Sequence, residues 1–252
     1  MNKILVDYIK KHNLKFHIDD AGRDDDVFKQ IEAYNHLGSL KSVSVLVTHP
    51  GAKKISSYLN QNPNIKVFLH PNLTTGHPVL NHKQIPSLAD ENGFKYSTLK
   101  MALALSLGLI KSNDIEKELS AQLKMAKKLN LKLSGIDGEQ HIQAFEPVSS
   151  LLIKHFADFP EFSFRSLSSL KAQSIIGKIK LLSLKILAMI STKKFKLPKT
   201  WNLAYQKYYM ASWEKLNLST INKSLLIVIH PGTEFDKIDS TLKLDDRPPT
   251  NT

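Results

Sequence analysis

Residues 14–22 read LKFHIDDAG, a short and largely apolar run that ends in two adjacent carboxylates followed by glycine. Three later stretches have the same form: FLHPNLT at 68–74, GIDGEQH at 135–141 and VIHPG at 228–232. Each begins like a buried strand and ends in acidic or histidine side chains beside glycine or proline. In a parallel α/β fold the carboxyl ends of the strands open on one face, where active sites collect. These stretches therefore predict one site built from strand ends.

The hydrophobic pattern between these stretches alternates strands with helices. We expect strands at 14–18, 42–47, 65–69, 131–137, 162–165 and 225–229, and helices at 24–37, 52–59, 114–129, 147–156, 168–192 and 201–216. On the helix at 114–129 the apolar positions predict one buried face, which leaves Glu118 and Gln122 outside. Residues 71–97 are interrupted by proline and glycine, and a loop of this length is usually functional.

Strand–helix–strand order with short connections favours a parallel sheet with right-handed crossovers. A TIM-like parallel β/α barrel of seven or eight strands accommodates the pattern, and an open doubly wound sheet is the alternative. We expect an N-terminal arm at 1–13, the barrel at 14–235 and a polar tail at 236–252. The sequence has no glycine-rich dinucleotide or phosphate-loop signature, so nucleotide binding has no support.

Composition limits the chemistry. The 252-residue chain has a net charge of +12 and no cysteine, so a metal would have to be held by His, Asp, Glu and water. We find neither a signal-peptide core at the N-terminus nor the roughly 18 uncharged apolar residues of a membrane span, and we expect a cytoplasmic protein. Residues 162–213 contain many lysines and no acid. Such a block can bind an anionic surface, although a solvated helix face is the commoner explanation.

The pair Asp19 and Asp20 carries the clearest chemical signal. Adjacent side chains at a strand end point in different directions, so one carboxylate can bind a metal while the other takes a proton from water. Two carboxylates side by side repel one another, and a cation or hydrogen-bond donor is expected nearby. The structural alternative is an Asp–Asp cap for the helix that follows Gly22.

Taken together, these motifs resemble the YdjC-like carbohydrate deacetylase family. The resemblance rests on the order and spacing of DDxG at 19–22, KSVSVLV at 41–47, LHxxLTxGxPV at 69–79, IPSL at 85–88 and DxNGF at 90–94. It continues through residues 136–141, 164–165 and 229–232. The resemblance implies a distorted β/α barrel that removes acetyl groups from N-acetylated sugars, such as chitooligosaccharides, with the help of a divalent metal.

Carried over position by position, the resemblance implies that Asp20 and His70 are metal ligands and that Asp19 is the base that activates water. His230 would protonate the leaving amine, and Arg165 would orient Asp19 or a substrate oxygen. The division of labour is chemically consistent. A metal polarises the amide carbonyl and lowers the pKa of water, a carboxylate takes the proton, and a histidine returns it to nitrogen.

One departure from the family pattern concerns the third metal ligand. The family usually reads DSHxH where this chain has DGEQH at 137–141, so Glu139 stands in the place of a ligand histidine. Two carboxylates and one imidazole shift the preference from Zn²⁺ toward harder ions such as Mg²⁺ or Mn²⁺. Alternatively, His141 supplies the ligand, or the site holds no metal.

Three functions remain in competition. The leading hypothesis is a metal-dependent deacetylase of N-acetylated sugars or oligosaccharides, and the second is a catalytically degenerate glycan-binding protein. The third is a deacetylase of a lipid-linked glycan, in peripheral contact with a membrane through the apolar and basic stripes of 168–192. A homodimer is left open, and no nucleic-acid partner is expected, because no recognition motif accompanies the positive charge.

Overall fold

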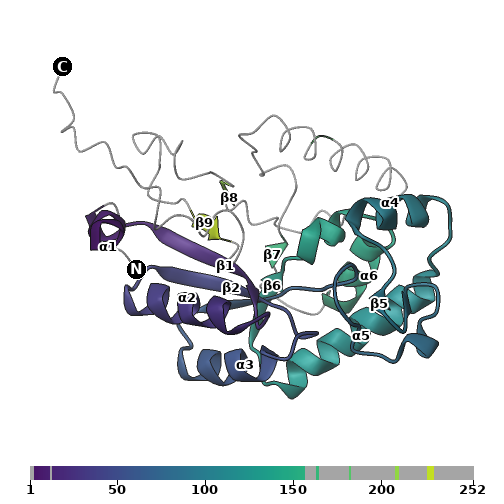
Figure 1. The fold of residues 1–252 in the computed structure, drawn as a ribbon, viewed down its shortest axis with the longest axis horizontal. Helices are drawn as coiled ribbons and strands as arrows, with labels where there is room; N and C mark the ends of the chain where they lie inside the picture. Colours follow the sequence, from purple (N-terminus) through teal and green to yellow (C-terminus); the bar gives the residue numbers. More distant parts are fainter. Residues whose placement is uncertain are drawn as a thin grey trace.

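The computed structural model describes residues 3–11, 13–156, 163–164, 182, 208–209 and 226–229. Its centre is a seven-stranded sheet in the order β7-β6-β3-β2-β1-β9-β8 (Figure 1). The strands are β1 (Lys15–Ala21), β2 (Leu40–Val45), β3 (Lys66–Leu69), β6 (Leu133–Ile136), β7 (Ser163–Phe164), β8 (Tyr208–Tyr209) and β9 (Leu226–Ile229). All neighbouring pairs in this sheet are parallel, which confirms the predicted α/β class. Closure into a barrel remains a prediction, because β7 and β8 each pair with one neighbour within the described residues.

The strand register brings the predicted site segments to one edge of the sheet. Ile18 of β1 pairs with Val43 of β2 and with Ile229 of β9. Leu69 of β3 pairs with Ile136 of β6. Because parallel strands end at the same edge, the polar residues that follow Ile18, Leu69 and Ile136 are brought close together there.

Helices connect the strands and cover the sheet. They are α1 (Lys3–Lys11), α2 (Asp25–His36), α3 (Ala52–Gln61), α4 (Thr98–Ser106), α5 (Ser112–Lys128) and α6 (Val148–Phe156). In Figure 1, α2 and α3 lie on one side of β1 and β2, and α4, α5 and α6 gather at the end of the sheet away from α1. Asp24 caps α2 by accepting hydrogen bonds from the N–H groups of Asp26 and Val27, an interaction worth about 1 kcal/mol. Within the described part of the chain, we find no helix long and apolar enough to cross a membrane.

Helix α5 holds the long loop at 71–97 through buried polar side chains. Glu118 accepts hydrogen bonds from the N–H groups of Val79 at 2.8 Å and Leu80 at 3.1 Å. Gln122 both accepts from the N–H and donates to the carbonyl of Asn72. The prediction that Glu118 and Gln122 face outward is therefore wrong: both are fully buried. The loop packs over this face of the helix, and the two side chains replace water as partners of its backbone.

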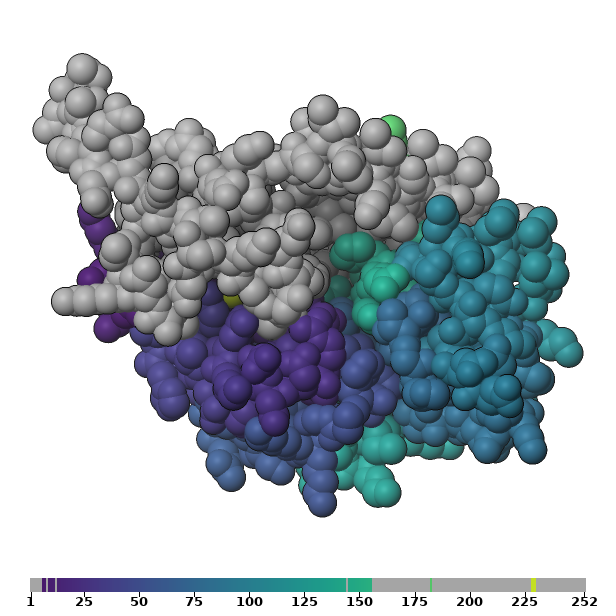
Figure 2. All heavy atoms as spheres, in the orientation of Figure 1, coloured from purple at the N-terminus to yellow at the C-terminus, as the bar shows by residue number. Residues whose placement is uncertain are grey.

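The structure contains elements inside and after this loop that the sequence pattern did not predict. The short antiparallel strands β4 (Ala89–Asp90) and β5 (Gly93–Phe94) pair with one another, and α4 follows them. Leu99 and Leu103 of α4 and its C-cap residue Leu107 are 65%, 59% and 63% exposed. This part of the chain forms the right-hand surface in Figure 2. Leucines that face solvent do not mark the buried face of a helix, so their spacing does not indicate how α4 packs.

Two predicted helices fall late in the chain. The prediction for 201–216 is wrong at Tyr208–Tyr209, which form β8 and pair with β9. Tyrosine favours strands, and pairing with a neighbouring strand outweighs a helical spacing of aromatic residues. The predicted helix at 168–192 lies outside the described residues except for position 182, which is helical.

Candidate metal centre

Strand β1 ends in a backbone distortion that separates its two carboxylates. Its pairing with β2 shifts register at this point, and Asp20 has a φ of 59°, a left-handed conformation that aspartate tolerates better than most residues. The Asp19 side chain is 1% exposed, whereas that of Asp20 is 14% exposed. The turn at Gly22 packs directly against the backbone of Gly51. A Cβ atom at Gly51 would lie 2.5 Å from the carbonyl oxygen of Gly22. The two adjacent carboxylates are thus held in different surroundings.

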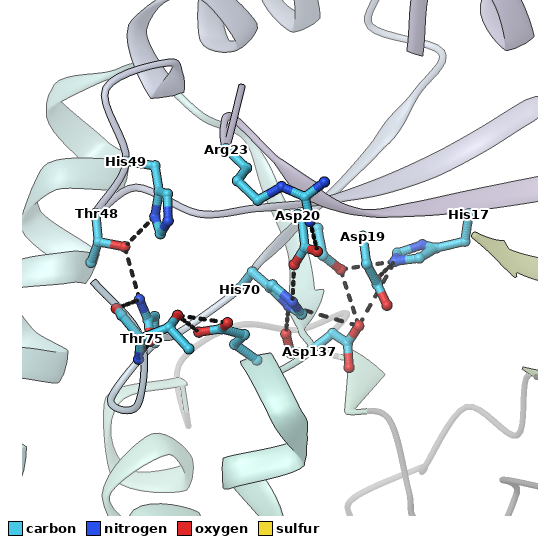
Figure 3. Close-up of polar contacts among 12 residues, drawn as sticks. His17, Asp19, Asp20, Arg23, Thr48, His49, His70, Thr75 and Asp137 are labelled. Carbon is cyan, nitrogen blue, oxygen red and sulfur yellow. Dashed lines mark hydrogen bonds and ion pairs between the residues drawn. The ribbon is translucent and has the colours of Figure 1, made fainter. Parts of the chain in front are cut away.

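Asp20 and His70 meet at the edge of the sheet. Nε2 of His70 lies 3.4 Å from Oδ1 of Asp20, and Nδ1 forms a hydrogen bond with the backbone carbonyl of Asp137 (Figure 3). A carbonyl oxygen can only accept, so Nδ1 carries a proton and Nε2 is directed toward Asp20. Two neighbouring ligand atoms about 2.1 Å from one ion lie about 3.0 Å apart in octahedral geometry and about 3.4 Å apart in tetrahedral geometry, and metal-binding histidines commonly donate their other N–H in this way. The pair has the spacing and orientation of two adjacent metal ligands.

The negative charges of nearby carboxylates favour the protonated form of His70. Burial alone would lower the pKa of His70, but the hydrogen bond with Asp20 and the charges of Asp19, Asp137 and Asp20 outweigh burial and raise that pKa to about 9. Arg23 donates a hydrogen bond from Nη1 to Oδ2 of Asp20 at 2.9 Å. In the absence of an ion, the imidazolium proton therefore balances part of the carboxylate charge. A divalent cation can take over this role when it displaces the proton.

Glu139 follows β6, which neighbours β3 on the side away from β2. It begins the 3₁₀ helix η2 (Glu139–Ala144), and its N–H donates to the carbonyl of Pro71 at 3.0 Å, which fixes it beside the residue after His70. The Thr75 hydroxyl lies 2.7 and 2.8 Å from the two carboxylate oxygens. Burial raises the pKa of Glu139, while the hydrogen bond from Thr75 and the charge of His70 act in the opposite direction. The carboxylate thus interacts electrostatically with His70 and is hydrogen-bonded to Thr75.

A second buried histidine, His17, lies beside Asp19. Its Nε2 is 2.9 Å from Oδ1 of Asp19 and 2.8 Å from Oγ of Ser44, and its Nδ1 is 2.7 Å from Oγ of Ser42. The Ser44 hydroxyl donates to Oδ2 of Asp137 at 3.1 Å. Figure 3 shows His17 reaching from its strand toward Asp19 and Asp137. The network joins β1, β2 and the segment after β6 beneath the Asp20–His70 pair.

Two neighbouring groups could therefore hold a cation. Among the residues that the structure describes, His17, Asp19 and Asp137 are the one set of three whose ligand atoms all lie within 4.8 Å of one another. His17 and Asp19, however, already form a hydrogen bond at 2.9 Å, whereas Asp20 and His70 face one another at the spacing of ligands. Carboxylates and imidazole without thiolate suit Mg²⁺, Mn²⁺ or Zn²⁺. The donor set therefore fits a divalent cation.

The structure brings together some of the residues predicted from the sequence. Asp20 and His70 face each other, Asp19 lies next to them on β1, and Glu139 is held by Thr75. Arg165 and His230 lie outside the described residues.

Other residues of the site were given no role by the sequence analysis: His17, Arg23, Thr75 and Asp137. His17 could have been connected with Asp19, because residues two apart on a strand lie on the same face. Asp137 belongs to a strand-end motif. For Thr75, 64 positions before Glu139, no local pattern indicates the contact.

The fold and the site together define a parallel α/β protein with a carboxylate–histidine centre at the carboxyl ends of its strands. Comparison with known proteins identifies the family within this class. The model of the YdjC-like protein family matches residues 13–249, and the chain belongs to this family.

Curated relatives give the comparison more detail. The carbohydrate deacetylase of Oceanobacillus iheyensis is 31% identical over 148 residues, which make up 58% of this chain and 61% of that protein. The carbohydrate deacetylase of Xenopus laevis is 33% identical over 117 residues, or 46% of this chain and 36% of that protein. The chain thus matches less than two thirds of the length of either relative.

A solved structure shares the fold. It belongs to an Enterococcus faecalis protein named provisionally for cellobiose-phosphate cleavage, with a TM-score of 0.54 and 17% sequence identity. The match covers 86% of this chain and 79% of that one. At this level of identity the likeness concerns the fold alone.

Proposed function

We propose that this protein is a metal-dependent carbohydrate N-deacetylase that hydrolyses the acetamido group of N-acetylated sugars. Membership of the YdjC-like family and the names of its curated relatives support this activity. The observation that carries the proposal is the Asp20–His70 pair, spaced at 3.4 Å and oriented by the Asp137 carbonyl, with the separate carboxylate of Asp19 beside it. The proposal includes closure of the parallel sheet into the distorted barrel implied by the family resemblance.

In this proposal Asp20, His70 and Glu139 hold one divalent cation. A bound cation would polarise the acetyl carbonyl and lower the pKa of water. The carboxylate-rich set favours Mg²⁺ or Mn²⁺ over Zn²⁺. Glu139 would exchange its hydrogen bond with Thr75 for the ion, and Arg23 would keep Asp20 oriented.

In this proposal Asp19 and His230 transfer protons, and Arg165 has an orienting role. Asp19 accepts a proton from water as the water oxygen adds to the acetyl carbon. His230 donates a proton to the amide nitrogen as the C–N bond breaks, which releases acetate and a free amine, and Arg165 orients Asp19 or a substrate oxygen. The sheet register supports the role of His230, because Ile229 at the end of β9 pairs with Ile18, the residue before Asp19.

A sugar-binding protein without catalysis is the competing function. It is favoured by the hydrogen bond between Thr75 and Glu139, which engages the carboxylate expected as the third ligand. The departure from the family pattern at Glu139 points in the same direction.

Acetate release separates the two functions. Purified protein is treated with EDTA, dialysed, and assayed on N-acetylated chitooligosaccharides with and without added Mg²⁺, Mn²⁺ or Zn²⁺. The proposal predicts acetate release only when an ion is present, and none from the Asp20→Asn variant. Binding of the oligosaccharide without acetate release under any of the three ions would support the sugar-binding function instead.

A further inference from the structure

We propose that His17 is a positioning residue for the reaction. Its Nε2–H group holds the carboxylate of Asp19 in the orientation from which that carboxylate accepts a proton. The inference rests on the proposed function, in which Asp19 is the base. It also assigns the neighbouring group of His17, Asp19 and Asp137 to hydrogen bonding rather than to a second cation.

The hydrogen-bond network assigns the position of the His17 proton. The Ser44 hydroxyl gives its proton to Oδ2 of Asp137, so its oxygen can accept from His17 Nε2 at 2.8 Å. Oδ1 of Asp19, at 2.9 Å from the same nitrogen, can only accept when the carboxyl group is ionised. Nε2 therefore carries the proton, and Nδ1 accepts from the Ser42 hydroxyl at 2.7 Å. The Nε2–H form of His17 satisfies every one of these contacts.

Packing holds the ring in this orientation. The His17 imidazole meets the edge of the Phe68 ring at 5.5 Å between centroids, with an interplanar angle of 81°. His17 and Ser42 are direct partners in the β1–β2 ladder, and the His17 side chain is 1% exposed. A flip of the ring would break contacts with Ser42, Ser44 and Asp19 together. The ring can therefore act as a fixed donor to Asp19.

The two contacts of Nε2 argue against His17 as a metal ligand. Binding an ion through Nε2 would require His17 to give up its contacts with both Asp19 at 2.9 Å and Ser44 at 2.8 Å. His70 has the opposite arrangement, since its Nδ1 is engaged by the carbonyl of Asp137 and its Nε2 faces Asp20. The fold thus gives the two histidines different tasks.

Side-chain ¹⁵N NMR of histidine tests the assignment without any turnover. In the metal-free protein, His17 is expected in the Nε2–H form, with Nδ1 in the chemical-shift range of an acceptor. Addition of Zn²⁺ should change the ¹⁵N shifts of His70 and leave the tautomer of His17 unchanged. An Nδ1–H form of His17, or a shift of its Nε2 to that of a zinc ligand, would overturn the proposal. If Zn²⁺ does not bind, the tautomer in the metal-free protein decides the matter.

Kinetics then test the role in the reaction. His17→Gln retains an amide donor near the position of Nε2, whereas His17→Leu has a similar size and no donor. His17→Leu should lower kcat by about 10- to 100-fold with KM and metal affinity unchanged, and His17→Gln should recover most of kcat. Equal losses in the two variants, or a loss that lies in metal affinity, would contradict a positioning role. Should the wild-type protein release no acetate, the proposed function fails, while the NMR result still stands or falls independently.

Discussion

His17 and His70 are both buried, both lie beside an aspartate, and both belong to the same edge of the sheet, yet their surroundings differ. Both ring nitrogens of His17 face side chains, which include two serine hydroxyls. One nitrogen of His70 is engaged by the backbone carbonyl of Asp137, and the other faces Asp20 at 3.4 Å. Burial and residue type do not separate a histidine proposed to position a carboxylate from one proposed to bind a metal. The partner of Nδ1 distinguishes the two: it is the Ser42 hydroxyl in His17 and the Asp137 carbonyl in His70.

The difference follows from what each partner can offer. A hydroxyl can donate or accept, so Ser42 and Ser44 can complete the hydrogen bonds of a ring that carries its proton on Nε2. A backbone carbonyl can only accept, so it fixes the proton of His70 on Nδ1 and directs the other nitrogen toward the carboxylate. In the metal-free protein that nitrogen holds a proton, and in the loaded protein we expect it to hold the ion.

The largest effect is expected from Asp20→Asn. This change keeps the size of the side chain and removes the charge opposite His70, so a site with two remaining ligands should bind Mn²⁺ at least about 100-fold more weakly. Activity should fall with it. Equilibrium dialysis with Mn²⁺ measures the affinity, and His17→Leu is the matched control that should bind the ion normally. Equal loss of Mn²⁺ in the two variants would remove the distinction between the two histidines.

Asp19→Asn should separate proton transfer from metal binding. The variant should bind Mn²⁺ as wild type does and lose about 10²- to 10⁴-fold in kcat, as expected when a general base is removed. Rates of acetate release at saturating Mn²⁺ provide the measurement. A normal rate would exclude Asp19 as the base and would leave His17 without a residue to position.

Glu139→Ala is expected to have an intermediate effect. Loss of the third ligand should weaken Mn²⁺ binding by about 10- to 100-fold, while Glu139→His should retain binding and shift the preference toward Zn²⁺. Thr75→Val, which removes the hydroxyl that holds Glu139, is the control and should bind the ion at least as well as wild type. If Glu139→Ala binds Mn²⁺ normally, Glu139 is not a ligand, and His141→Ala becomes the next variant to measure.

A smaller effect concerns pH and stability in the metal-free protein. The pKa of His70 is raised to about 9 from its ordinary value of 6.5, so its protonated form stabilises the folded state. This contribution is fully present below about pH 6.5 and is lost as the pH rises to about 9. Urea unfolding between these limits should show the loss. The slope should be shallower in Asp20→Asn, which lacks the carboxylate that pairs with His70, and unchanged in His17→Gln.

The sequence predicted the strands and strand-end residues of the site better than the contacts between its side chains. Short apolar runs that end beside glycine or proline indicated the strands, and the polar ends of β1 and β3 supplied Asp19, Asp20 and His70. Parallel topology then brings these ends together without further information. The contact between Thr75 and Glu139 depends on the path of a long loop, which no local pattern encodes.

The errors in the predicted fold have a similar origin. Glu118 and Gln122 were expected outside because polar residues usually are, yet each is buried by the loop whose backbone it binds. The roles proposed for His17 and His70 likewise depend on partners contributed by other strands. Local pattern identifies which side chains are present at a strand end, and tertiary hydrogen bonds determine what each of them does.

The most direct test of the central claim is a crystal structure of the protein soaked with Mn²⁺, with the ion located from its anomalous scattering. We predict one peak between Asp20 and His70, about 2.0–2.3 Å from a carboxylate oxygen of Asp20 and from Nε2 of His70. His17 should keep its hydrogen bonds to Asp19 and Ser44. A peak enclosed by His17, Asp19 and Asp137, with Asp20 and His70 still paired, would contradict the assignment of the two histidines.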